Sequence, residues 1–346
     1  MKWIRGFAGT ITLCMMINAC GSGQKSENPV KPASFGNHNF AALIRQFSQG
    51  AVANGPWAGY WWPYSQDGTA QAEALYDHVQ SGAGAQDWEL SHHGTALRDL
   101  QSWWGHCNGW AAATALFSEP RASKSVGGVT FSVADRKALL SEVAMEVTAD
   151  FFGTRVTDPS DTSSLAFQDV FPDQFFLVFT NYIGQGYPVI IDRYTGYQVW
   201  NQPMAGYQMA PVTPDDYLGA LPDAPRIFRI NLTTTIWWLR DDVPGDHLTE
   251  PFTFADGPSY ESRTLRYELW LDGPVQFNSA GAVVSSGDVV LARQGEYVTG
   301  GAWRNTDLEL TNSHPDYLWI PHSLAPSSGF SNPKIDSGWV SHYLVN

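Results

Sequence analysis

The sequence predicts an α+β domain in which a helical first half, with a cysteine at a helix N-terminus, packs on an antiparallel sheet. In the first half, apolar residues recur at mixed three- and four-residue spacing between Gly-rich breaks, which is typical of amphipathic helices. In the second half, short apolar or alternating runs are bounded by Gly, Pro, Asn and Asp, which is typical of strands. Helices come first and strands second, so alternating βαβ units are not expected.

The helical elements are predicted in order along the first half. A Ser132–Asp135 capping box starts the longest of them, whose apolar face continues through Phe151. Residues 60–67, with Pro63 inside them, are expected to form a loop. The other predicted helices cover residues 40–47, 70–79 and 94–103, and a stretch from about Cys107 to Leu116 that ends before Glu119-Pro120.

The strands are predicted from the change in pattern after residue 173. Two apolar runs joined by a Gly-containing turn are interpreted as buried strands, and a later Thr-rich stretch alternates as a half-buried strand does. The predicted strands cover residues 174–179, 187–192, 226–239, 266–271, 284–293 and 300–303.

The N-terminus has the pattern of an export signal. Lys2 and Arg5 precede a mostly apolar stretch, which is too short for a confident membrane-spanning helix, and Ala19-Cys20-Gly21 follows. Residues 17–20 resemble the lipobox of bacterial lipoproteins, which predicts a signal peptide over residues 1–19 and a lipid anchor on Cys20; an ordinary secretory signal is the alternative. Residues 20–35 are interpreted as a flexible tether and residues 36–346 as one domain, placed in the cell envelope or secreted.

Composition limits the partners. The formal net charge is −14, and it becomes −16 once Lys2 and Arg5 are removed with the signal peptide. No basic cluster accompanies this acidity, which argues against nucleic acid as a partner. Fifteen tryptophans are present, and those of residues 60–64 and 103–104 cluster in loop-like contexts, as in grooves that bind peptides or sugars.

Cys107 is the strongest candidate for a functional residue. Three cysteines are present, and processing would remove Cys14 and modify Cys20, so no internal disulfide is expected. A helix that starts at Cys107 would direct its unpaired N–H groups and its positive dipole end at the sulfur, favouring the thiolate and an oxyanion. Gly105 and Gly109 would let a substrate approach closely. The alternative is an inert cysteine buried in a core helix.

The segment from Val199 to Tyr207, VWNQPMAGY, resembles the elicitor peptide of oomycete cell-wall transglutaminases, and departs from it at Met204 and Ala205. The segments around Cys107, residues 190–192 and residues 313–319 also resemble parts of this transglutaminase elicitor family, so that the resemblance covers about residues 59–322. The chain would then be a bacterial relative of the oomycete enzymes, with a papain/transglutaminase-like fold.

The resemblance implies protein-glutamine γ-glutamyltransferase activity. Cys107 would attack the carboxamide of a protein glutamine, ammonia would leave, and the thioester would pass its acyl group to a lysine amine. The expected partners are therefore protein glutamine and lysine side chains, besides the membrane reached through Cys20. No metal and no other cofactor is expected, since no acidic loop has calcium-site spacing.

The general base is harder to assign. Families of this kind place a histidine on a strand after the nucleophile helix, but no histidine lies between Cys107 and Asp246, and the expected strand offers Phe175 and Phe176. His314, within the resemblance, is the best candidate. Asp192 closes an apolar strand and could orient a histidine or act directly. The weaker candidates are His106, His247, His322 and His342.

Trp104, Trp200 and Pro203 are candidates for shaping the substrate groove, with plain packing as the alternative. Two rival functions remain open for the chain as a whole. One is a cysteine peptidase or amidase that uses water as the acyl acceptor. The other is a surface binding protein that kept the fold and lost its base.

Overall fold

The computed structural model describes residues 36–53, 55–155, 169–193, 197–292, 300–304 and 314–345. The predicted signal peptide, the predicted lipid anchor at Cys20 and the tether lie outside these residues. Within them, no helix is both long and apolar enough to cross a bilayer.

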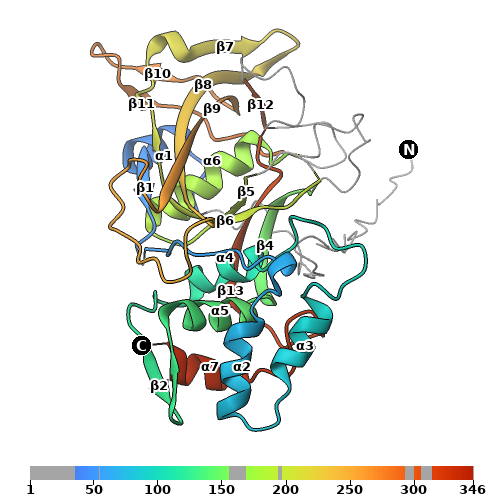
Figure 1. The fold of residues 1–346 in the computed structure, drawn as a ribbon. Coiled ribbons are helices and arrows are strands. Elements are labelled where there is room, and N and C mark those ends of the chain that lie inside the picture. Colours follow the sequence, from blue (N-terminus) through green and yellow to red (C-terminus); the bar gives the residue numbers. More distant parts are fainter. Residues whose placement is uncertain are drawn as a thin grey trace.

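The helices fall into two groups, visible in Figure 1 as a lower group and a pair near the upper strands. The lower group is α2 (Ala70–Val79), α3 (Ala85–His92), α4 (Cys107–Leu116), α5 (Val133–Val143) and α7 (Ser337–Leu344). The upper pair is α1 (Phe40–Phe47) and α6 (Pro172–Asn181). Short 3-10 helices cover Tyr64–Gln66, Ile183–Gln185 and Pro214–Asp216.

An antiparallel sheet of nine strands runs through the described molecule, with the main order β12-β9-β8-β6-β5-β13-β4. β1 pairs with β6, and β7 pairs with β8. The bounds are β1 Gln49–Ala51, β4 Val147–Gly153, β5 Ile190–Asp192, β6 Asn201–Met209, β7 Tyr217–Leu221, β8 Ala224–Leu239, β9 Tyr260–Leu271, β12 Gly301–Trp303 and β13 Tyr317–Leu324. Two hairpins are separate, β2 (Lys124–Val126) with β3 (Val129–Phe131), and β10 (Gln276–Phe277) with β11 (Val283–Ser285).

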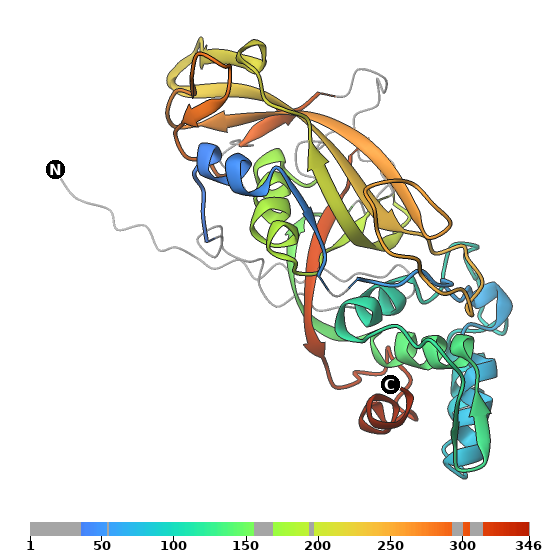
Figure 2. The same cartoon turned by 90° about the vertical axis from the view of Figure 1, so that its left-hand side faces the viewer.

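The sheet separates two hydrophobic cores. Because side chains alternate along a strand, Ile190 of β5 packs in the core that contains α4, and Ile191 packs in the core that contains α6. Trp319 and Leu318 of β13 divide in the same way. Figure 2 shows α1 and α6 on one face of the long strands and the α4–α5 layer at the lower end. The strand residues near Cys107 can therefore each be assigned to one face of the sheet.

The predicted α+β class is confirmed, and several predicted elements are found where the patterns placed them. Residues 40–47 and 70–79 are helical, and α4 begins at Cys107. The capping box of α5 is present, with the Ser132 side chain accepting from the Asp135 backbone N–H and the Asp135 side chain accepting from that of Ser132.

Other predictions are wrong. Residues 174–179 lie in α6 and not in a strand, because an apolar run fits a helix buried on all sides as well as a buried strand. Pro172 at the first helical position was the signal for this helix. The helix after Ser132 ends at Val143, and its apolar pattern continues as β4. Residues 94–103 form turns and coil and not the predicted helix, and the residues before them form α3, which ends at His92.

Candidate active site

Cys107 occupies the first position of α4, immediately after the N-cap residue His106. The helix lies against β6 and β13. Its packing face consists of small, fully buried side chains at Ala111, Ala112 and Ala113, which allow a close approach to the sheet. The first-turn N–H groups and the positive end of the helix dipole therefore lie at the Cys107 end, as predicted.

The two glycines near Cys107, Gly105 and Gly109, serve internal packing, whereas they were predicted to let a substrate approach closely. A Cβ on Gly105 would lie 2.5 Å from the Trp61 ring and 2.8 Å from the Trp61 carbonyl oxygen. A Cβ on Gly109 would lie 2.2 Å from the Ser141 carbonyl oxygen in α5. Both distances are far below van der Waals contact, so glycine is required here for the loop and the helix pair to pack.

Asp192 lies one peptide group away from Cys107. The Cys107 Sγ is 3.8 Å from the Val199 carbonyl oxygen. The next backbone group, the Trp200 N–H, donates to Asp192 Oδ1 at 2.8 Å. Alternation along β5 directs Asp192 to the same face of the sheet as Ile190, which is the face that α4 covers. The structure therefore brings together two of the three predicted catalytic residues.

Asn201 extends this arrangement along the same face. Its Oδ1 accepts from the Tyr317 hydroxyl at 3.2 Å and from Trp319 Nε1 at 3.0 Å. Burial raises the pKa of Tyr317 well above its ordinary value, and the negative charge of Asp192 raises it further, so Tyr317 stays protonated. Neither Asn201 nor Tyr317 was predicted as a site residue, although both lie in segments that carried the family resemblance.

Cys107 differs from an accessible catalytic thiol in two respects. Its side chain is fully buried. It is also disulfide-bonded, whereas no internal disulfide was expected; the described residues contain no second cysteine. A sulfur in a disulfide cannot attack a carboxamide, so the Cys107 sulfur has to be reduced and uncovered before it can act as a nucleophile.

The described contacts of His314 are with Asp169 and Trp303 rather than with Cys107. His314 Nδ1 lies 3.4 Å from Asp169 Oδ2, and the His314 ring stacks on Trp303 with centroids 4.3 Å apart. Trp303 in turn contacts Phe175 of α6, in the core on the other face of the sheet from α4. In this state, the role of His314 as the base is therefore not supported by its contacts.

The weaker histidine candidates also have other neighbours. His247 Nε2 lies 2.7 Å from the Ser259 hydroxyl, and His322 Nε2 lies 2.7 Å from Asp150 Oδ2. The His342 ring packs edge-on against Tyr343. The His106 ring, although adjacent to Cys107 in sequence, lies with Glu89 and Glu142. No described contact pairs any of these rings with the Cys107 sulfur.

Of the predicted groove residues, Trp200 lies nearest to the Cys107 region. Its ring is half-buried and contacts Trp61, with centroids 5.2 Å apart, and Trp61 itself packs on Gly105. Trp104 is half-buried beside Trp103. Pro203 is buried inside β6, opposite Ile190, which favours the packing alternative for this residue.

The part of the chain that contains α4 and β5 matches a known protein family. Residues 91–217 match the model of the transglutaminase elicitor family. The predicted resemblance to the transglutaminase elicitor family is confirmed. The matched residues of this chain include α4, β5 and the Val199–Trp200 segment. This range is shorter than residues 59–322, over which the sequence motifs suggested a resemblance.

The fold is similar to that of a solved transglutaminase. The crystal structure of the GP42 transglutaminase from Phytophthora sojae superposes with a TM-score of 0.58 at 20% sequence identity, covering 89% of this chain and 92% of that chain. At this identity the similarity establishes the fold alone, which is thus transglutaminase-like as expected. No curated protein matches the sequence.

Proposed function

We propose that the protein is a protein-glutamine γ-glutamyltransferase with Cys107 as its nucleophile. The observation that carries the proposal is that Cys107, at the N-terminus of α4, and Asp192 flank the same Val199–Trp200 peptide group within the elicitor-like segment. The family match and the fold support the reaction class.

The proposed reaction begins with the reduced Cys107 thiol. The thiol loses its proton and the sulfur attacks the carboxamide carbon of a glutamine, giving a tetrahedral oxyanion that the first-turn N–H groups of α4 can stabilise. The carbon–nitrogen bond then breaks, the nitrogen takes up a proton, and ammonia leaves a thioester. A lysine amine attacks that thioester, which yields the isopeptide bond and restores the thiol.

We assign the proton-accepting role to Asp192. Of the three predicted catalytic residues, Asp192 and Cys107 share the α4 face, whereas the described contacts of His314 involve Trp303 and Asp169. Asp192 also positions the peptide group that lies against the sulfur, because it accepts from the Trp200 N–H. Proton transfer to Asp192 requires the sulfur to be reduced and the Trp200 segment to shift when a substrate binds.

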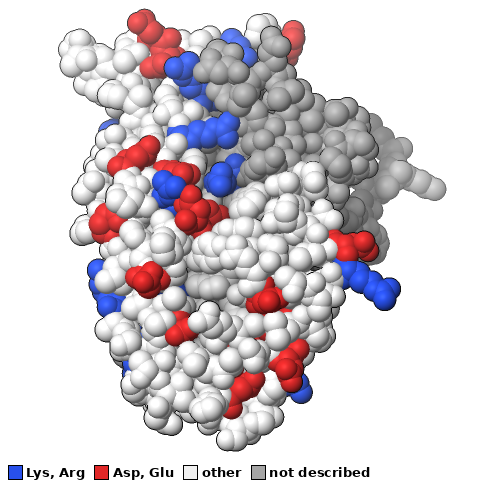
Figure 3. All heavy atoms as spheres, in the orientation of Figure 1, with Lys and Arg blue, Asp and Glu red and all other residues white. Residues whose placement is uncertain are grey.

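The surface charge suits lysine-bearing acceptor proteins. Acidic side chains are spread over the lower, helical part of the face drawn in Figure 3, with few Lys or Arg among them. With a net charge of −14, the chain attracts cationic partners at low ionic strength. We therefore expect the acceptor to be supplied by a basic protein surface and the reaction rate to fall as salt is added.

Incorporation of a biotinylated amine into a glutamine-rich protein such as casein, in the presence of a reductant, tests the proposal. Cys107→Ser should abolish incorporation, and Ser125→Ala, at an exposed serine of β2, is the control and should retain it. Unchanged incorporation by Cys107→Ser would exclude Cys107 as the nucleophile. Ammonia release without incorporation would indicate an amidase, and neither activity would indicate the binding-protein alternative.

A further inference from the structure

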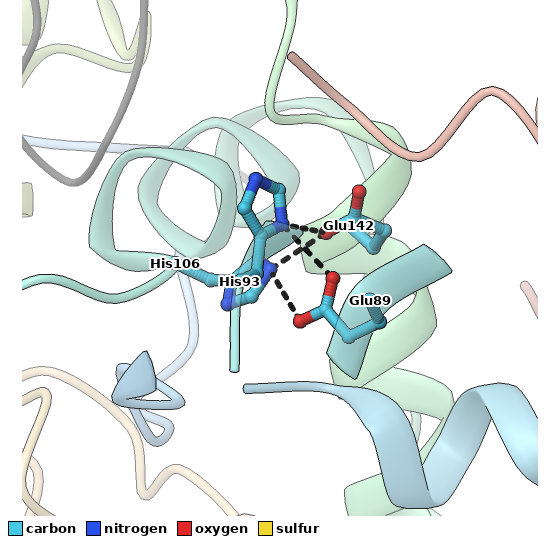
Figure 4. A group of neighbouring side chains, drawn as sticks. All are labelled: Glu89, His93, His106 and Glu142. Atoms are coloured by element: carbon cyan, nitrogen blue, oxygen red, sulfur yellow. Dashed lines mark hydrogen bonds and ion pairs between the residues drawn. The ribbon is translucent and has the colours of Figure 1, made fainter. Parts of the chain in front are cut away.

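Four buried side chains converge between α3, α4 and α5. They are Glu89 and His93 at the C-terminal end of α3, His106 at the N-cap of α4, and Glu142 on α5. One ligand atom from each lies within 4.8 Å of the other three, and all four residues are buried. Figure 4 shows the rings of His93 and His106 turned toward the two carboxylates.

The separations of these atoms match a shared metal ion. His106 Nε2 lies 2.7 Å from Glu142 Oε2 and 3.2 Å from Glu89 Oε1, and His93 Nδ1 lies 2.9 Å from Glu89 Oε2 and 4.0 Å from Glu142 Oε2. Four ligand atoms at about 2.0–2.1 Å from a tetrahedral zinc ion would lie about 3.3 Å from one another. Small adjustments of the four side chains therefore suffice to place an ion among them.

The contact between His106 and Glu142 is the observation that favours an ion over protons. The two atoms are 2.7 Å apart and can form an ion pair if His106 is protonated, but neither His106 Nε2 nor Glu142 Oε2 has a described partner in hydrogen-bond geometry. Both atoms are fully buried, and a buried polar atom without a hydrogen bond is costly. An ion between them would use both lone pairs.

Neighbouring groups hold three of the four side chains by hydrogen bonds, as is usual for metal ligands. His106 Nδ1 lies 3.2 Å from the Trp62 carbonyl oxygen, to which it must donate, so that Nε2 is directed at the carboxylates. Glu89 Oε1 accepts from the Thr69 N–H at 2.9 Å. Glu142 Oε1 accepts from the Asn332 N–H.

We propose that Glu89, His93, His106 and Glu142 bind one divalent transition-metal ion, with zinc as the best match. Two imidazole nitrogens favour zinc and its neighbours over calcium or magnesium, which prefer oxygen ligands. Two carboxylates, two neutral imidazoles and a dication leave the buried cluster without net charge. The ion joins three helices at the residue that precedes Cys107, so it fixes the start of α4. No metal was expected from the sequence, in which the four-residue spacing between Glu89 and His93 was the signal for these ligands.

Metal binding to the full protein tests the proposal without any activity assay. The protein is stripped with EDTA, its fold is checked by near-UV circular dichroism, and it is titrated with Co²⁺ and then with Zn²⁺. We expect one equivalent of Co²⁺ with the visible absorption of tetrahedral cobalt, displacement by Zn²⁺, and a higher melting temperature with either ion.

Two conservative variants and one control locate the ion. Glu142→Gln keeps an acceptor for the Asn332 N–H but removes a charged ligand. Glu142→Gln and His93→Gln should each weaken metal binding more than about 100-fold, because the loss of a residue that only hydrogen-bonds to a ligand already lowers metal affinity by about 10- to 100-fold. His322→Gln removes an exposed histidine paired with Asp150 and should bind like the wild type. Folded wild-type protein that binds neither ion at 100-fold excess overturns the proposal. Unchanged binding by both Glu142→Gln and His93→Gln overturns it as well.

Discussion

Cys107 and Asp192 lie on opposite sides of one peptide group, the one that joins Val199 to Trp200. The sulfur is 3.8 Å from its carbonyl oxygen, and the carboxylate accepts from its N–H at 2.8 Å. Any movement of this peptide group therefore changes the contacts of both residues. The elicitor-like segment thus forms part of the candidate active site and connects its two polar side chains.

Asp192→Asn tests the role of this carboxylate. The amide keeps an acceptor for the Trp200 N–H but cannot take up a proton at neutral pH. If Asp192 accepts the thiol proton, amine incorporation should fall by about 10²- to 10⁴-fold across the whole pH range, with the melting temperature nearly unchanged. Asp150→Asn, at a surface carboxylate, is the control and should keep wild-type activity. A less than threefold effect of Asp192→Asn would leave Asp192 with a positioning role only.

Gly109→Ala should destabilise the helical layer. The added Cβ would lie 2.2 Å from the Ser141 carbonyl oxygen and 2.6 Å from Met145 Sδ, so α4 and α5 must separate. Overpacking of this kind costs about 1–3 kcal/mol of unfolding free energy, which urea denaturation measures. Gly55→Ala is the matched control, since no atom lies within 4 Å of its Cβ position. Equal stability of the two variants would show that α4 and α5 are not packed as described.

Lys137 is fully buried and should be critical for stability. Its Nζ donates to Glu119 Oε1 and to the Ala58 carbonyl oxygen at 2.9 Å each, and to that of His247 at 2.6 Å. Lys137→Met leaves the Glu119 carboxylate without this cation, and breaking a buried pair costs about 3–5 kcal/mol.

Lys124→Met provides the comparison, because Lys124 is only partly buried and donates to the Val345 carbonyl oxygen at 3.0 Å. Its loss of unfolding free energy should stay within about 1 kcal/mol. If both variants unfold at the same urea concentration, the buried pair contributes nothing beyond an exposed contact.

Asp173 gives the protein a pH dependence of stability. Burial raises the pKa of Asp173 from 3.8 to about 7. Between these values the folded protein holds a proton that the unfolded chain has lost, so stability falls as the pH rises through this range and stays lower above it. Asp173→Asn removes the ionisation, and its stability relative to the wild type should be about 3 kcal/mol greater at pH 8 than at pH 5. If chemical denaturation gives the same difference in stability between Asp173→Asn and the wild type at both pH values, this account is wrong.

Local sequence patterns located the start of α4 and the face of Asp192, because each depends on a few neighbouring residues. Cys107 follows a Gly-containing loop and precedes an alanine run, and Asp192 ends a short apolar strand. The α6 helix was missed because it is buried on all sides. Its apolar residues, such as Phe175 and Phe176, therefore show no helical period in the sequence. The contacts of His314 with Trp303 and Asp169 depend on long-range packing, which spacing along the chain does not encode. The same holds for the cluster of His93 and His106.

The identity of the acyl-enzyme tests the central claim most directly. The reduced protein is mixed with a glutamine peptide without any amine, quenched in acid, digested, and examined by mass spectrometry. We predict a thioester on Cys107 whose added mass is that of the peptide less ammonia, and which disappears when a lysine analogue is added before the quench. An acyl adduct on any other residue, or amine transfer by a protein in which Cys107 stays alkylated, would contradict it.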